Sequence, residues 1–297
     1  MSLRDRLFVA MQYALPQHFL SRIVLRTTRV RTPAVKNALI SKFLHGFRPD
    51  MSEAAQPDAL AFASFNDFFT RTLRADARPL DPDLRTLVSP VDGTVSQIGR
   101  LDGSNILQAK GHDYTIDSLL AAPRDLLAPQ GTSSWADSFR GGGFATLYLA
   151  PYNYHRIHMP IAGTLRAAWF VPGKLFSVNA VTASAVPGLF ARNERVVCIF
   201  ENGPHLFAMV LVGALFVGSI STVWHGDVAP RHPRRITNLP VDGSRAPLHL
   251  EKGDEMGRFN MGSTVILVTP PGLADWLPSF AAGSRVRFGE ALGRMLQ

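Results

Sequence analysis

The sequence predicts an α+β protein, with N-terminal amphipathic helices followed by a β-rich domain. Two observations predict this class. In residues 1–50, apolar side chains recur every three or four positions, which is the period of a helix. From residue 86 onward the period changes to short β-branched runs separated by glycine and proline. We therefore divide the chain into a helical segment, 1–50, and a β-rich domain, 51–297.

Three short helices are expected in the helical segment. The first ends at Pro16 and repeats apolar residues at helical spacing: Leu3, Leu7, Phe8, Met11 and Leu15. A second begins near residue 18. The third begins at Thr32–Pro33, an N-cap residue followed by proline at the first helical position.

Positive charge is concentrated in the same segment. Of the formal net charge of +8, residues 1–50 carry nine basic and two acidic residues, hence +7. No apolar run is long enough to span a bilayer, and the start lacks the pattern of a cleaved signal peptide. Basic helices with Phe, Leu and Met faces favour an anionic lipid surface over nucleic acid. We expect peripheral attachment to the cytoplasmic face of the cell membrane; the alternative is that these faces pack on the protein's own core.

The rest of the chain alternates turns and strands. Residues 50–62 are expected to be a linker, and Ser64 and Asp67 form a capping box that opens a helix over 65–73. Residues 86–99 predict a strand, an Asp-Gly turn and a second strand, and Ile116–Leu120 predicts a helix. Leu206–Ile220 is too short to span a membrane and predicts a buried strand pair. Further strands are expected at 144–149, 163–170, 195–200 and 265–268.

Cysteine and histidine usage limits the chemistry. The one cysteine, Cys198, lies in an apolar run, which excludes disulfide scaffolding and favours a reducing compartment. His155 and His158 lie in a loop bounded by prolines, and three-residue spacing in extended backbone points them to opposite faces. No His-Glu pair of zinc-protease spacing is nearby, so we expect no metal site.

A polar, glycine-rich run ends at Gly262-Ser263-Thr264 and passes directly into a strand. Ser263 could be an ordinary turn residue, and Asp92 before Gly93 could be an ordinary turn aspartate. Together with a histidine they form the set that activates a hydroxyl: an orienting carboxylate, a base and a nucleophile. No GxSxG motif surrounds Ser263. A Ser-His-Asp lipid hydrolase and a non-catalytic lipid-binding module remain the alternatives.

Six motifs in order give the chain a resemblance to bacterial phosphatidylserine decarboxylase proenzymes. Besides the basic N-terminal helices, they span nearly the whole length: residues 65–69, 89–93, 154–160, 172–179, 190–195 and 252–264. The Pro-Val-Asp-Gly-Thr-Val segment, 90–95, is similar to the hairpin of barrel-sandwich folds, an analogy that suggests such an architecture for the catalytic domain.

The resemblance implies a self-cleaving enzyme. The bond between Gly262 and Ser263 would break, giving a β chain of residues 1–262 and an α chain of residues 263–297 that stay together as a heterodimer; a higher oligomer is left open. Ser263 would attack Gly262, with His158 as base and Asp92 as its orienting group, and would become a covalent pyruvoyl cofactor.

In turnover the resemblance implies that this group forms a Schiff base with phosphatidylserine and acts as an electron sink. The products would be phosphatidylethanolamine and CO2, a step of phospholipid biosynthesis. His155 is expected to serve decarboxylation by returning a proton.

Three positions qualify the resemblance. Met261 replaces a leucine that many relatives have, an exchange of similar volume. Asn153 stands where relatives often have aspartate, which removes a charge near the histidines. The arginine-rich residues 231–235 are either a headgroup patch or a solvated loop.

Overall fold

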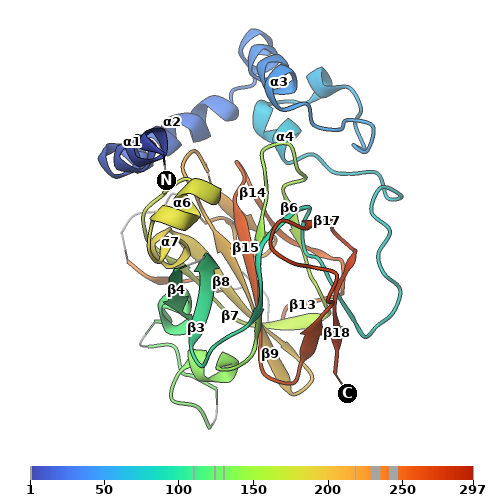
Figure 1. Ribbon diagram of the computed structural model, residues 1–297. Coiled ribbons are helices and arrows are strands. Elements are labelled where there is room, and N and C mark those ends of the chain that lie inside the picture. The colour runs from blue at the N-terminus through green and yellow to red at the C-terminus, as the bar shows by residue number, and fades with distance from the viewer. Residues whose placement is uncertain are drawn as a thin grey trace.

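The computed structural model describes residues 2–109, 111–123, 125–129, 131–217, 219–228, 235–240 and 247–296. Helices α1 to α4 lie together at one end of the molecule, and the sheets form a body that extends away from them toward the C-terminus (Figure 1). The helices are α1 (Leu3–Ala14), α2 (Gln17–Thr28), α3 (Pro33–Phe47), α4 (Phe65–Phe69), α5 (Ile116–Leu120), α6 (Ala180–Ala185) and α7 (Leu189–Arg192), with 3-10 turns at Ala59–Ala61 and Trp135–Phe139. This arrangement confirms the α+β class.

The N-terminal helices begin and end where the sequence predicts. Ser2 caps α1 by accepting the Asp5 amide at 3.2 Å, and the helix stops before Pro16. Pro33 occupies the first turn of α3. Within the described residues no helix is both long and apolar enough to cross a bilayer.

One antiparallel sheet of nine strands forms the core of the body. Its order is β12-β7-β8-β9-β15-β5-β2-β17, with β13 also paired to β7. The strands are β2 (Gly93–Arg100), β5 (Gly143–Tyr148), β7 (Gly163–Val171), β8 (Arg195–Asn202), β9 (His205–Val212), β12 (Thr237–Asn238), β13 (His249–Leu250), β15 (Thr264–Thr269) and β17 (Arg285–Val286). Every residue of β15 is buried, and it pairs with β9 on one edge and β5 on the other. Cys198 is a buried free thiol on β8.

Smaller sheets flank this core. A four-stranded sheet has the order β11-β10-β14-β6, a three-stranded sheet the order β1-β18-β16, and β3 pairs with β4. Their strands are β1 (Thr86–Val88), β3 (Asn105–Ala109), β4 (His112–Thr115), β6 (Arg156–His158), β10 (Ile220–Thr222), β11 (Gly226–Asp227), β14 (Glu255–Phe259), β16 (Ala274–Trp276) and β18 (Ala291–Met295). These sheet paths are open along the described residues, so the barrel-sandwich analogy is not reproduced as a closed barrel.

The structure corrects three local predictions. Residues 86–99 do not form a hairpin: β1 pairs with β18 and β2 with β5. The expected linker, 50–62, is packed rather than free: Ala54 is buried and bridges Leu73, and Ala59 is buried against helices α3 and α4. Helix α4 ends at Phe69 rather than residue 73, since Leu73 instead forms a bridge with Ala54.

The strand pair expected in 206–220 is divided. Strand β9 is buried from Phe207 onward, but β10 begins only at the last residue of the segment, Ile220, and belongs to a different sheet. Of the arginine-rich residues 231–235, positions 231–234 lie outside the described residues.

Helices α3 and α4 share a small phenylalanine core. The buried members of this core are Ile40, Phe43, Ala59, Phe65, Phe68 and Phe69, and Met261 packs against it. Phe43 contacts Phe69 edge-on, with ring centroids 5.7 Å apart. The phenylalanine core therefore reaches from α3 to the turn that precedes Ser263.

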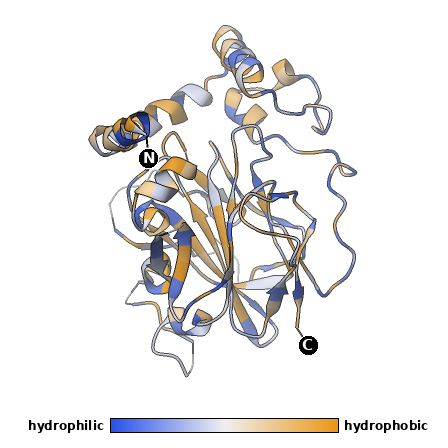
Figure 2. Cartoon of the chain, in the orientation of Figure 1, coloured by the Kyte–Doolittle hydropathy of each residue, from blue (hydrophilic) through white to orange (hydrophobic). Residues whose placement is uncertain are grey.

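Helices α1 and α2 pack against residues 172–179, one of the six motifs noted in the sequence. The Gln17 side chain accepts the Leu175 amide at 2.7 Å, and the Gln12 side chain accepts the Ser177 amide at 3.0 Å. Large apolar side chains nevertheless stay exposed on these helices, and Figure 2 shows hydrophobic residues along them. They include Leu3, Leu7, Met11, Phe19 and Ile23, which are 48–73% exposed.

Candidate active site

Ser263 lies in the short connection between β14 and β15. The residue is 3% exposed, and its carbonyl accepts the Leu149 amide at 2.7 Å, which ties it to the end of β5. Its hydroxyl has no hydrogen-bond partner within the described residues. Gly262 before it has φ +23°. A buried hydroxyl without a partner thus lies beside the peptide bond between Gly262 and Ser263.

His155 packs directly against Gly262. A Cβ atom placed on Gly262 would lie 2.8 Å from His155 Cε1 and 3.3 Å from Nδ1. The ring is fully buried and stacks on Phe69, with centroids 4.1 Å apart. Because Nε2 lies 3.2 Å from the Pro151 carbonyl, it carries the hydrogen and leaves the unpartnered Nδ1 as acceptor. Burial lowers the pKa of His155 to about 3.

His158 occupies a separate environment, as the three-residue spacing predicted. Its Nδ1 donates to the Gly253 carbonyl at 2.7 Å, and its Nε2 accepts from the Tyr154 hydroxyl at 2.9 Å. The ring stacks on Phe288, with centroids 3.8 Å apart. Burial lowers the pKa of His158, while the hydrogen bond to Gly253 and the charges of Glu255 and Asp92 oppose this shift.

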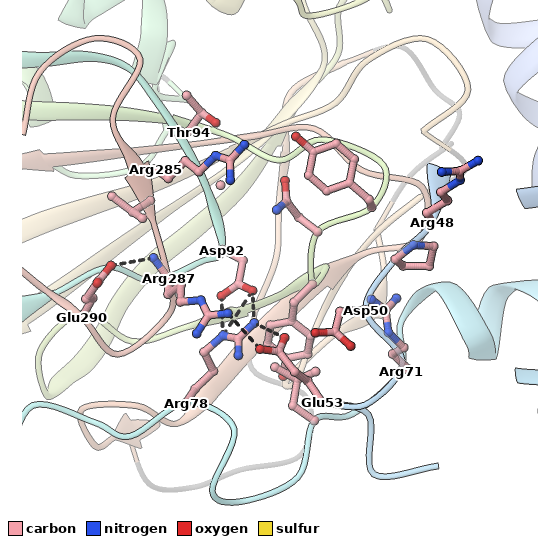
Figure 3. Close-up of a pocket in the computed structure, with 17 residues that line it drawn as sticks. Arg48, Asp50, Glu53, Arg71, Arg78, Asp92, Thr94, Arg285, Arg287 and Glu290 are labelled. Carbon is pink, nitrogen blue, oxygen red and sulfur yellow. Dashed lines mark hydrogen bonds and ion pairs between the residues drawn. The ribbon is translucent and has the colours of Figure 1, made fainter. Parts of the chain in front are cut away.

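Asp92 is held by an arginine rather than by a histidine. Its carboxylate accepts Arg78 Nε at 2.9 Å and the Phe288 amide at 2.9 Å. Arg78 also pairs with Glu53 at 2.7 Å, which lowers the pKa of Glu53 (Figure 3). Both nitrogens of His158 are occupied by other groups, so the expected direct contact between Asp92 and His158 is replaced by an indirect one through Phe288.

An apolar cavity of about 520 Å³ opens beside Ser263. Its walls come from the N-terminal helices and from the turns around Gly262 and Ser263. Side chains that line it include Val24 on α2, Phe43 and Phe47 on α3, Phe69 on α4, Phe216, and Met261. We call it the apolar cavity. The partly exposed Phe47 of α3 and the buried Ser263 therefore border the same cavity.

Sequence reasoning missed several partners at this site. Phe69 and Tyr154 lay within quoted motifs without an assigned role, whereas Arg78 and Phe288 carried no signal. Asn153 accepts the Ala150 amide at 2.8 Å and shapes the histidine loop as a turn residue. Among the described residues no cluster of side chains is arranged to bind a metal ion.

A family model described as phosphatidylserine decarboxylase matches residues 65–294, a span that includes Asp92, His155, His158 and Ser263. The chain belongs to the phosphatidylserine decarboxylase family. A second model, described as PSD, matches residues 7–48. The resemblance inferred from the motifs is thereby confirmed, and the chain is an enzyme of a decarboxylase family.

Curated members of the phosphatidylserine decarboxylase family match almost end to end. The phosphatidylserine decarboxylase proenzyme of Bordetella pertussis is 50% identical over 295 residues, covering 98% of this chain and 95% of the relative. The proenzymes of Pseudomonas fluorescens and Marinobacter nauticus are 48% and 49% identical, each covering 98% of both chains. The helical segment and the β-rich domain are therefore both common to these relatives.

Proposed function

We propose that this chain cuts itself between Gly262 and Ser263 and then decarboxylates phosphatidylserine to phosphatidylethanolamine. The observation that carries the proposal is the buried, unpartnered Ser263 hydroxyl beside a glycine that touches His155. The relatives' printed name, phosphatidylserine decarboxylase proenzyme, supports both the substrate and a precursor state. The proposal divides the chain into residues 1–262 and 263–297.

Self-cleavage begins with attack of Ser263 Oγ on the carbonyl carbon of Gly262. The peptide C–N bond breaks as the C–O bond forms, and the serine nitrogen takes the proton that the hydroxyl loses, giving an ester. Elimination of the Gly262 carboxylate then removes the α-proton and leaves a dehydroalanine at 263. Addition of one water releases ammonia and gives the pyruvoyl group. Glycine suits the acyl position because it has no side chain to hinder attack.

His158 is the proposed base for this attack. Its Nε2 is the acceptor nitrogen, and a neutral ring is favoured because burial lowers its pKa. In the uncut chain the Tyr154 hydroxyl occupies Nε2, so proton transfer has to pass through this hydroxyl or displace it. Asp92 supports the step electrostatically: its charge favours the imidazolium, and its hydrogen bond to Phe288 positions the ring that stacks on His158.

The pyruvoyl group fits the chemistry of position 263. When formed, it supplies an electron sink for loss of CO2 from an amine-bearing substrate. His155 is proposed to return the proton. In the uncut chain His155 is buried, which lowers its pKa, and it touches Gly262. A free chain end at Gly262 can move aside, and an imidazole that becomes accessible recovers proton affinity. The apolar cavity keeps water away from this position.

A lipid substrate fits the surroundings of the apolar cavity. Phe47 lines the cavity and is 46% exposed, so the exposed apolar side chains of the N-terminal helices continue into the cavity wall. We place these helices on the anionic cytoplasmic face of the membrane, where their basic residues add attraction. The two chains remain associated in this proposal because β15 pairs along both of its edges.

Intact-mass analysis of purified, active protein tests the proposal. The expected result is two chains, with the smaller one beginning at residue 263 and lacking the serine nitrogen. Fully active protein consisting only of the uncut chain would refute it. The rival lipid hydrolase predicts the opposite result, an active protein in which Ser263 remains part of the uncut chain.

A further inference from the structure

A second cavity lies on the other side of the histidine loop. Pro151 lines the apolar cavity, whereas its neighbours Tyr152, Asn153 and Tyr154 line a separate cavity of about 460 Å³. Five arginines and four carboxylates line this second cavity, so we call it the charged cavity (Figure 3). The loop that carries His155 is therefore the wall between an apolar space and a charged one.

Most charges in the charged cavity neutralise one another. Arg78 pairs with Asp92 and Glu53, and Arg287 Nη2 pairs with Glu53 at 2.9 Å. Glu290 accepts the Arg287 backbone amide at 2.9 Å. In contrast, Arg48 and Arg285 form no ion pair with any of the described residues. Asp50 and Glu290 also form no ion pair within the described residues, so the five arginines and four carboxylates of the cavity leave a net charge of +1.

Arg71 is the buried cation of the charged cavity. It is 3% exposed, and within the described residues neither its Nε nor its Nη1 has a hydrogen-bond partner. Burial lowers its pKa, and the charges that oppose this shift act from a distance: Asp92, Glu53, Asp50 and Tyr154. A buried guanidinium without an acceptor is unfavourable, and its planar N–H groups match an anion that offers two oxygens.

We infer that the charged cavity is a binding site for a phosphate-type anion, either free phosphate or the headgroup of an anionic lipid, held by the unpartnered N–H groups of Arg71. Arg48 and Arg285 add two exposed cations at its rim. The unpartnered, planar N–H groups of Arg71 and the net positive charge of the lining favour an anion with several acceptor oxygens, such as phosphate. Lipid has access as well, because Arg48 directly follows Phe47 of the exposed α3 surface.

An anion at Arg71 would also act on His155. The Arg71 charge opposes protonation of His155, whereas the backbone of Pro151 and of Ala150 favours it; the ring also contacts Phe69 and Gly262. Arg71 follows Phe69 by two residues, just beyond the end of α4. Neutralising Arg71 makes His155 easier to protonate. The consequence for turnover depends on the proposed role of His155, whereas binding does not.

Binding can be measured on the full-length Ser263→Ala chain, so that neither cleavage nor turnover affects the result. Inorganic phosphate and dihexanoyl phosphatidylglycerol below its micelle concentration are titrated separately by calorimetry. We expect one saturable site that Arg71→Gln weakens by more than about tenfold and Arg285→Gln by a few fold. Arg74→Gln is the matched control, because Arg74 is exposed and pairs with Asp76; its affinity should equal that of the parent.

The two titrations distinguish free phosphate from a lipid headgroup as the ligand. Binding of phosphate alone assigns a free-anion site, binding of the lipid alone assigns a headgroup site, and binding of both shows that the phosphate group suffices. If Arg71→Gln does not fold, the affinities of Arg285→Gln and Arg48→Gln test the inference instead. A histidine NMR titration should show a higher His155 pKa at saturation. The inference is overturned if neither probe binds, or if the Arg71, Arg48 and Arg285 variants bind like the parent. It is also overturned if Arg74→Gln loses as much affinity as Arg71→Gln does. An unchanged His155 pKa would show that the bound anion does not act on His155.

Discussion

His155 and Gly262 are in such close contact that the glycine has no room for a side chain: an added Cβ would lie 2.8 Å from His155 Cε1. Gly262→Ala is therefore expected to shift the imidazole, destabilise the chain by about 1–3 kcal/mol and slow self-cleavage. Denaturant unfolding and a gel time course measure the two effects.

Gly188→Ala is the control for backbone strain alone, because Gly188 has φ +64° and open space around it. It should lose stability without a change in cleavage rate. If Gly188→Ala slows cleavage as much as Gly262→Ala does, the contact with His155 is not the cause.

Ser263→Ala should yield an uncut protein without decarboxylase activity, since no oxygen remains to attack Gly262 or to leave by elimination. Thr264→Val is the matched variant, because Thr264 is the adjacent buried hydroxyl and is also unpartnered among the described residues. It should be cut and active. Mass spectrometry of both variants after purification gives the answer, and a cut Ser263→Ala chain would contradict the cleavage mechanism.

His158→Gln and His155→Gln should separate cleavage from turnover. The first removes the proposed base and should leave the chain largely uncut. The second should still be cut but lose activity by about 10²–10⁴-fold, the usual contribution of a general acid or base. Single-time-point gels and CO2 release on the same preparations distinguish the two; equal loss of cleavage in both would assign the histidines a common role.

Elements that are fixed by interactions between residues close in the sequence could be predicted, whereas pairings between distant segments could not. Pro16 and Pro33 set helix ends through their own backbone constraints, so α1 to α3 were predictable. The pairing of β1 with β18 was not, because an Asp-Gly pair predicts a local hairpin, while here the chain passes from one sheet to another.

The same distinction applies to the candidate active site. Ser263, His155 and His158 could be found from residue types and motifs. Their partners could not: Phe288 and Arg78 reach Asp92 only through tertiary packing, and both are ordinary residue types in unremarked segments. Likewise the contact of His155 with Gly262 joins two motifs whose separation in sequence gives no sign of it.

We expect the titration of His155 to lower the free energy of unfolding of the uncut chain as the pH falls from 6.5 to 5. His155 has a folded pKa near 3 against about 6.5 when unfolded, so in this window the unfolded chain binds the extra proton and stability rises with pH. Glu194 acts in the opposite sense, because burial raises its pKa to about 7 and the folded chain binds the extra proton.

Differences between variants resolve these contributions. In the Ser263→Ala background, His155→Gln should reduce the slope of unfolding free energy against pH by up to about 1.4 kcal/mol per pH unit, and Glu194→Gln should increase it. Urea unfolding at pH 5, 5.5, 6 and 6.5 measures the slopes. An unchanged slope in His155→Gln would mean that this histidine titrates normally in the uncut chain.

Membrane attachment should be separable from self-cleavage by surface substitutions on the first two helices. Deleting residues 1–44 would remove Ile40 and Phe43 from the phenylalanine core that supports His155 through Phe69, so a deletion confounds the two. Leu3, Leu7 and Phe19, at 73%, 62% and 56% exposure, can instead be changed to serine together.

We expect this triple variant to cut itself normally, to bind anionic vesicles at least tenfold more weakly, and to decarboxylate vesicle-borne lipid more slowly, since each buried side chain contributes about 1.5–3 kcal/mol. Leu84 and Leu127, at 85% and 88% exposure and outside the N-terminal helices, provide the control pair of serine substitutions. Sedimentation with vesicles at low and high salt measures binding. If the control pair weakens binding as much as the triple variant does, the membrane-facing surface lies elsewhere on the molecule, and the apolar cavity receives its lipid by a route other than the helical face.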